Sequence, residues 1–188
     1  CRGFLSGFLF LVLVLFSIGC DNNDDASNNS NITQQLTRGT QTTVLNPIAD
    51  SYVNSSSKSR NYGTRSELLV DSSPKVYRTF IKFDVPQLSG DIQSVKLRLR
   101  VFNGTSNGPE FYKTSNSWSE TGITWYNQPG TTGSKLADLG SVSTGWIEVD
   151  VTSAVSGSGD ISFIILPDSS NGIDFYSREA SSKPELVI

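Results

Sequence analysis

Apolar and polar residues alternate along several short segments of this chain. In the segment 95–102, VKLRLRVF, the odd positions are apolar, while Lys96, Arg98 and Arg100 occupy even positions. Successive side chains of a strand point to opposite faces, so this spacing predicts a strand with an apolar inner face and a cationic outer face. Three cations on one face are typical of a solvated sheet surface, and a positive binding stripe is the alternative.

The segment 76–84, VYRTFIKFD, predicts a second strand with apolar residues on both of its faces. One face holds Tyr77, Thr79, Ile81 and Phe83, and the other holds Val76, Arg78, Phe80 and Lys82. Further strands are predicted at residues 67–70, 110–113, 135–142, 145–151, 161–166, 173–176 and 185–188. Clusters of Gly, Asn, Ser and Pro separate these segments, and only residues 151–155 suggest a helical turn. The pattern predicts an all-β fold, a β-sandwich of the jelly-roll type over residues 44–188.

The beginning of the chain has a different pattern. Residues 8–16, FLFLVLVLF, have the length of the apolar part of a signal peptide and are too short to span a bilayer. They lead into the sequence Ser-Ile-Gly-Cys, which is similar to a bacterial lipobox and makes Cys20 the residue that would be acylated. We therefore expect a lipoprotein signal peptide at 1–19 and a flexible, disordered tether at 20–43. An uncleaved anchor and an ordinary secretory signal are the alternatives.

The acidic run directly after Cys20, DNNDD, is similar to tags that direct some lipoproteins to the outer cell surface. The expected location is therefore extracellular, with a lipid anchor in the outer membrane. The chain starts with Cys1 instead of Met, which suggests a fragment of a longer protein, and a catalytic domain absent from it is an alternative that stays open.

Composition excludes several kinds of chemistry. The chain has no histidine, and both of its cysteines precede the predicted sandwich. Within that domain this excludes disulfides, thiolate nucleophiles, Ser-His-Asp triads and metal sites built on His or Cys. Charge is unevenly distributed: residues 42–113 hold ten Lys and Arg against six Asp and Glu, whereas residues 114–188 hold three against nine. This asymmetry predicts one basic and one acidic region.

A basic set of residues is the strongest candidate for a ligand site. Three of its cations, with an aromatic ring beside them, lie in the loop-like stretch SSSKSRNYGTR. Guanidinium groups bind carboxylates or sulfates through two hydrogen bonds, and aromatic rings stack on sugars, so this combination suits an anionic polysaccharide. The set consists of Lys58, Arg60, Tyr62, Arg65, Lys75, Arg78 and Lys82. The alternative is that Arg78 or Lys82 forms a buried ion pair with Asp84 or Glu179.

Two other groups of residues are candidates for a function. The segment 118–129, with two Trp and a Tyr, is either a platform for sugars or a plug at the end of the core, and the plug is favoured. The carboxylates lack the context of a glycosidase pair. No EF-hand loop is present, so no metal ligands are assigned, but oxygen ligands for a structural calcium leave that alternative open. No other cofactor and no nucleic acid partner are expected.

Seven segments in order give a specific resemblance. The chain from about residue 48 to residue 188 resembles the DNRLRE-type β-sandwich domain, also classed as carbohydrate-binding module family 96. The matching segments are ADSYV, NYGTRSELLV, YRTFIKFDV, VKLRLRV, WSETGITWYNQP, WIEVDVTSAV and FYSREASSKPELVI. The resemblance implies a non-catalytic jelly-roll module that binds an acidic polysaccharide such as alginate. It also adds Arg178, in FYSRE, to the candidate ligand residues.

The sequence thus predicts a surface lipoprotein that binds an acidic, alginate-like polysaccharide without catalysis and contacts the membrane only through its lipid anchor. The alternatives are the binding module of a polysaccharide lyase whose catalytic part is missing, and a structural or adhesive surface protein. Which polysaccharide is bound is left open.

Overall fold

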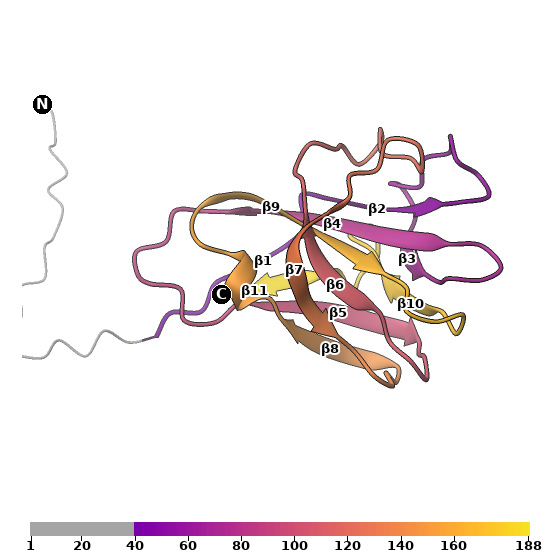
Figure 1. Cartoon of the computed structure of the whole chain (residues 1–188). Helices are drawn as coiled ribbons and strands as arrows, with labels where there is room; N and C mark the ends of the chain where they lie inside the picture. The colour runs from indigo at the N-terminus through magenta and orange to yellow at the C-terminus, as the bar shows by residue number, and fades with distance from the viewer. Residues whose placement is uncertain (1–39) are drawn as a thin grey trace, which may run out of the picture. The chain divides into compact units, whose positions relative to one another are not determined.

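The structure of the protein, a computed structural model, describes residues 40–188 (Figure 1). The predicted signal peptide, the lipidation site Cys20 and nearly all of the tether lie outside the described residues. Residues 40–188 form one compact unit. No helix among them has the length and apolar character needed to cross a membrane.

The described chain folds into two antiparallel sheets, as the alternation pattern predicts. The first sheet contains β1 (Val44–Leu45), β3 (Glu67–Val70), β5 (Lys96–Asn103), β8 (Gly145–Asp150), β10 (Ile173–Tyr176) and β11 (Glu185–Val187). The second contains β2 (Ala49–Asn54), β4 (Tyr77–Val85), β6 (Glu110–Thr114), β7 (Thr131–Asp138) and β9 (Gly159–Leu166), in the order β2-β4-β9-β6-β7. The sheets pack face to face as a sandwich, and the expected helical turn is a 3-10 turn at Thr152–Ala154 (Figure 1).

Strand β5 is the centre of the first sheet. β8 pairs along one of its edges, while β11 and β10 pair in succession with its two ends along the other edge. Its residues Leu97, Leu99 and Val101 are buried in the core between the sheets, and Lys96, Arg98 and Arg100 face outward. The predicted faces of this strand are therefore confirmed.

The core between the sheets also confirms the inner face of the second predicted strand. Ile81 and Phe83 of β4 are fully buried there. The Phe83 ring meets that of Phe163 of β9 edge to face, with 6.3 Å between their centroids. Burial of such aromatic side chains is the largest favourable term that holds a sandwich together.

The outer face of the second sheet has a second, smaller core. A long loop between β6 and β7, residues 115–130, folds over this face and packs Trp118 and Ile123 against Phe80 of β4. The Trp118 indole donates a hydrogen bond from Nε1 to Ser162 Oγ of β9 at 3.1 Å. Trp118 is thus a core residue, as the plug interpretation expects, but it covers the outer face of the second sheet and not the end of the sandwich core. The face of β4 that carries Arg78 and Lys82 is therefore a covered surface.

Three strands differ from the sequence prediction, and the two-residue strand β1 is one that was not predicted. β2 was not predicted, and all six of its residues are buried because sheet contacts cover one face and the 115–130 loop covers the other. A strand buried on both faces shows no alternation. β7 spans residues 131–138 instead of 135–142. Its first half is polar and exposed, so it has no apolar alternation, but it pairs with β6 after a shift in register.

Candidate functional site

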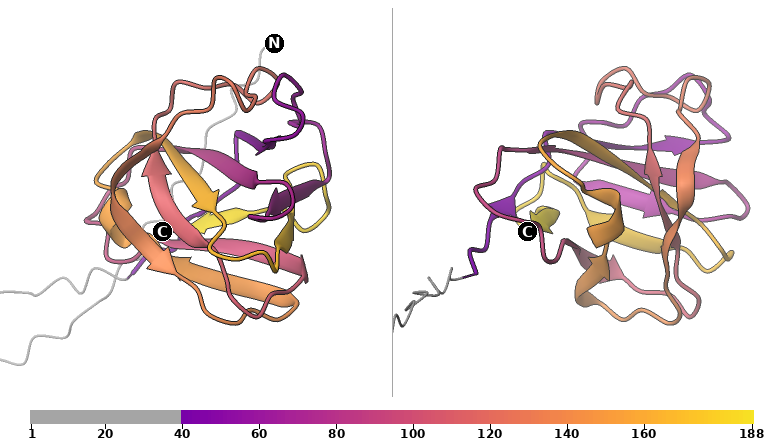
Figure 2. Two further views of the ribbon diagram at one scale, coloured as in Figure 1. Left: turned by 45° about the vertical axis from the view of Figure 1, so that its right-hand side comes forward. Right: turned by 60° about the vertical axis from the view of Figure 1, so that its left-hand side comes forward.

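One end of the sandwich collects three loops. They are the β2–β3 loop (residues 55–66), the β3–β4 turn (71–76) and the 115–130 loop (Figure 2). Ser55 and Val76 join the first two, since the Ser55 amide donates to the Val76 carbonyl and the Val76 amide donates to Ser55 Oγ, at 3.0 and 2.9 Å. The Tyr126 amide donates to the Lys58 carbonyl at 3.3 Å and joins the third. We call this end the basic loop surface, because of the cations described next.

Four of the predicted ligand residues lie exposed on the basic loop surface: Lys58, Arg60, Arg65 and Lys75. Within residues 40–188, none of the four has a carboxylate oxygen within 4.0 Å of its charged nitrogen atoms. The ion pairs of the described chain instead use Lys96, Arg98, Lys135 and Arg178. The exposed loop cations are therefore available to an anionic ligand.

Tyr62 lies beneath this surface. Its side chain is 7 % exposed and stacks on the ring of Tyr52, with centroids 4.3 Å apart. The guanidinium carbon of Arg60 lies 5.2 Å from the centroid of the Tyr62 ring, within the range of a cation–π contact. Tyr62 therefore supports Arg60, and little of its own ring is left for a sugar.

Tyr126 provides the exposed ring that Tyr62 does not. It is 74 % exposed and neighbours Lys58 through the backbone hydrogen bond described above. The sequence places Tyr126 in the aromatic segment 118–129 but not among the ligand residues. The signal that distinguishes it from the two Trp is the polar pair Asn127 and Gln128 directly after it.

Arg78 lies half-buried under the 115–130 loop. Its guanidinium carbon is 4.8 Å from the centroid of the Trp125 ring, and its Nη1 donates to Gln128 Oε1 at 3.3 Å. Burial lowers the pKa of the guanidinium, and its Nε has no hydrogen-bond partner in the described chain. These contacts hold the loop onto the sheet.

Lys82 is more deeply buried, with 7 % of its residue surface exposed. Its ammonium group donates to the carbonyl oxygens of Asn116 and Trp118 at 2.9 and 2.7 Å and lies 4.8 Å from the Trp118 ring centroid. The sequence alternative of an ion pair with Asp84 or Glu179 is not found for Lys82 or Arg78 among the described residues. Backbone carbonyls take that place for Lys82.

Arg178 lies between β10 and β11 and faces the base of the same loops. Its Nη1 contacts both carboxylate oxygens of Glu120, at 2.9 and 2.8 Å, and lies 3.8 Å from an oxygen of Glu179. The hydrogen bonds to Glu120 raise the pKa of the guanidinium. The structure thus brings Arg178 to the same end of the molecule but engages it in an internal ion pair.

Gly63 explains part of the local sequence. A Cβ atom at this position would overlap the carbonyl oxygen of Glu120, so the β2–β3 loop can approach the 115–130 loop only with glycine here. Asn61 fixes the same contact, because its Nδ2 donates to the carbonyls of Glu120 and Ile123, both at 2.7 Å. The two loops therefore form one supported unit.

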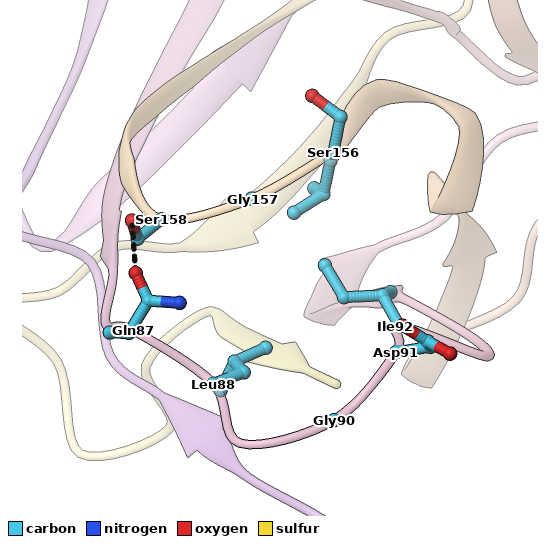
Figure 3. Close-up of a pocket in the computed structure, with 9 residues that line it drawn as sticks. Gln87, Leu88, Gly90, Asp91, Ile92, Ser156, Gly157 and Ser158 are labelled. Atoms are coloured by element: carbon cyan, nitrogen blue, oxygen red, sulfur yellow. Dashed lines mark hydrogen bonds between the residues drawn. The ribbon is translucent and has the colours of Figure 1, made fainter.

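A cavity of the described chain lies at the opposite end, between the β4–β5 and β8–β9 connections (Figure 3). It has a volume of about 350 Å³ and is lined by residues 87, 88, 90–92 and 155–158. Its lining contains no cation and no aromatic ring, and Asp91 is its one charged residue. It offers none of the groups that the basic loop surface presents.

Comparison with known proteins gives one family. The model of carbohydrate-binding module family 96 matches residues 41–188, which is nearly all of the described chain. No curated protein matches the chain.

Proposed function

Because the chain belongs to carbohydrate-binding module family 96 and is therefore a carbohydrate-binding module, we propose that its ligand is an acidic polysaccharide bound at the basic loop surface. An alginate-like uronate polymer is the favoured ligand. The observation that carries this proposal is the set of four exposed loop cations without carboxylate partners in residues 40–188.

The first step of the argument is charge. Exposed like charges repel one another, so four loop cations without partners are a net cost to the folded domain in the absence of ligand. A polymer with one carboxylate on every sugar offers a series of anions along its length. Arg60 and Arg65 have the planar guanidinium that binds a carboxylate through two parallel hydrogen bonds, and Lys58 and Lys75 add point charges.

The second step is the aromatic ring. Tyr126 presents an exposed face beside Lys58, and a pyranose ring packs its C–H face on such a side chain. In this proposal Tyr126 stacks on the sugar, and Tyr62 acts indirectly by holding Arg60. Ligand contacts by Arg78, Lys82 and Arg178 stay predictions, and the positions of these residues give them a supporting part here.

The proposal assigns no catalytic residues. The predicted lipid on Cys20 would hold the module at the outer surface of the outer membrane, where polymers too large to enter the cell are met. A lyase module remains the alternative function, and it differs by forming products with an ultraviolet-absorbing double bond.

Affinity electrophoresis of the full chain tests the ligand class. The gels contain alginate, pectate, a sulfated galactan or a neutral glucan, and each is run at low and at high salt. We expect retardation by alginate that weakens strongly between about 50 and 500 mM salt, because exposed charges are screened over about 8 Å at physiological ionic strength. Equal retardation by the neutral glucan, or binding unaffected by salt, would overturn the proposal, and ultraviolet-absorbing products would overturn its non-catalytic part.

A further inference from the structure

Three carboxylates from distant parts of the sequence meet behind the basic loop surface. Asp50 comes from β2, Glu120 from the 115–130 loop and Glu179 from the connection between β10 and β11. One oxygen atom from each lies within 4.8 Å of the other two. Clusters of acidic residues are common on protein surfaces. Whether this cluster can bind a cation depends on the burial and the hydrogen-bond partners of its oxygen atoms.

Asp50 is the unusual member of this cluster. The residue is 1 % exposed, and its Oδ1 has no hydrogen-bond partner among the described residues. Its Oδ2 accepts one hydrogen bond from the Arg178 amide at 2.8 Å. A buried carboxylate oxygen without a donor costs free energy, so this atom requires a partner that the protein groups do not supply.

The missing partner has to be a hydrogen-bond donor or a cation, because a carboxylate oxygen only accepts. Glu120 and Glu179, whose oxygens approach it, are carboxylates as well. A cation placed against Oδ1 would satisfy both the charge and the lone pairs.

Arg178 compensates only part of the negative charge. Its Nη1 binds both oxygens of Glu120 and lies 3.8 Å from Glu179, but it leaves Oδ1 of Asp50 without a partner. Three carboxylates thus face one guanidinium.

We propose that Asp50, Glu120 and Glu179 bind a calcium ion, with water completing its coordination. Calcium binds oxygen ligands at about 2.3–2.6 Å, so two of its ligands can be up to about 5 Å apart. The three oxygen atoms of this cluster lie within 4.8 Å of one another and meet that condition. Magnesium requires a smaller octahedron at about 2.0–2.1 Å and retains most of its water, so calcium is the expected ion. Glu120 would share its two oxygens between the ion and Arg178.

The ion would connect the sheet to the loops of the proposed glycan site. Glu120 Oε1 already accepts a hydrogen bond from the Asp50 amide at 3.0 Å, and the Glu120 carbonyl accepts one from Asn61 of the β2–β3 loop at 2.7 Å. A cation on Asp50 and Glu179 would hold these contacts in place. Calcium is therefore expected to order the basic loop surface, although its binding does not depend on the identity of the glycan.

The test measures metal binding and thermal unfolding of the full chain after chelation, with no polysaccharide present. Terbium luminescence excited through the protein's aromatic residues reports on the site, and calcium should displace the terbium. At about one hundred times its dissociation constant, calcium should raise Tm by roughly 5–10 °C, whereas magnesium at the same concentration should give much less.

Two variants and a matched control locate the site. Glu179→Gln should weaken calcium binding at least tenfold and keep the fold, since Glu179 is exposed. Asp50→Asn should abolish the response to calcium and raise Tm in the chelator, because it removes a buried charge. The control Glu148→Gln changes a carboxylate of the first sheet, paired with Arg98 at 3.1 Å, and should respond to calcium like the parent chain.

Three results would overturn the calcium site. They are an absent terbium signal and calcium shift in the parent chain, an equal shift with magnesium, or an equal loss of the shift in Glu179→Gln and Glu148→Gln. If Asp50→Asn does not fold, Glu179→Gln and its control decide the matter. A failed polysaccharide gel with an intact calcium response would reject the proposed ligand alone.

Discussion

Lys58 and Arg60 lie on the β2–β3 loop, and no carboxylate of residues 40–188 is close enough to form an ion pair with either of them. Lys96 and Arg98 lie on β5, and carboxylates of the neighbouring strands pair with both. Lys96 Nζ is 2.6 Å from Asp150 of β8, and Arg98 contacts both Glu148 of β8 and Glu185 of β11, at 3.1 and 2.6 Å. The pairing register places these groups directly across from one another.

The difference shows that Lys and Arg side chains have two separate roles in this domain. The strand cations are neutralised by their neighbours, and such exposed pairs each contribute about 0–1 kcal/mol to stability. They also keep the outer face of the sheet soluble. The loop cations have no such role, because their charge is balanced by no protein group in the described chain. The proposed binding of an acidic polysaccharide rests on this difference.

The largest expected effect is on binding by the loop cations. A variant with Arg60→Ala, Arg65→Ala and Lys75→Ala should bind alginate at least about a hundredfold more weakly, since each lost charge-assisted hydrogen bond costs about 1.5–3 kcal/mol. Its Tm should stay within a few degrees of the parent value. The matched control also removes three cations, all on the outer face of β5, with Lys96→Gln, Arg98→Gln and Arg100→Gln, and it should retain binding within about twofold. Equal losses in both variants would show that binding follows net charge and has no specific surface.

The next largest effect is a loss of stability, which should be larger when the buried Lys82 is replaced than when the more exposed Lys96 is replaced. Lys82→Met leaves the carbonyl oxygens of Asn116 and Trp118 without their donor, so it should lower the free energy of unfolding by about 2–4 kcal/mol. Lys96→Met on β5 should cost about 1 kcal/mol or less. Urea unfolding of both variants measures the contrast. A neutral effect of Lys82→Met would mean that the 115–130 loop does not depend on this ammonium group.

The sequence predicts the sandwich because alternation follows directly from strand geometry. The inner face of β4 and both faces of β5 could be read from periods of two, and the structure confirms them. Alternation cannot reveal what covers a second face. From the sequence, the outer face of β4 is therefore predicted to be exposed, with cations on both sides of Phe80. In the structure the 115–130 loop covers this face and buries Lys82.

The candidate site was predictable only in part, for a related reason. The cations of the β2–β3 loop are evident in the sequence, because a polar loop with three of them is unusual in a domain otherwise made of strands. Partners of the strand cations become visible only once the strand register is known. The cluster of Asp50, Glu120 and Glu179 has no local signature, since its members are 70 and 59 positions apart and meet only through the tertiary fold.

The smallest expected effect concerns the acid side of the strand pairs. The hydrogen bond from Lys96 holds the pKa of Asp150 well below its usual range. A folded-state pKa that is lower than the unfolded one stabilises the protein above the unfolded value, near 3.8, and this contribution is lost as the pH falls further. Asp150→Asn should therefore lower Tm by no more than about 2–4 °C at pH 6 and by less at pH 3, with the difference shrinking in high salt.

Thermal unfolding at the two pH values measures this, with Asp91→Asn as the control because Asp91 forms no ion pair in the described chain. A difference of the same size at both pH values would mean that Asp150 does not act through its charge, and the strand cations would then differ less from the loop cations than the geometry indicates.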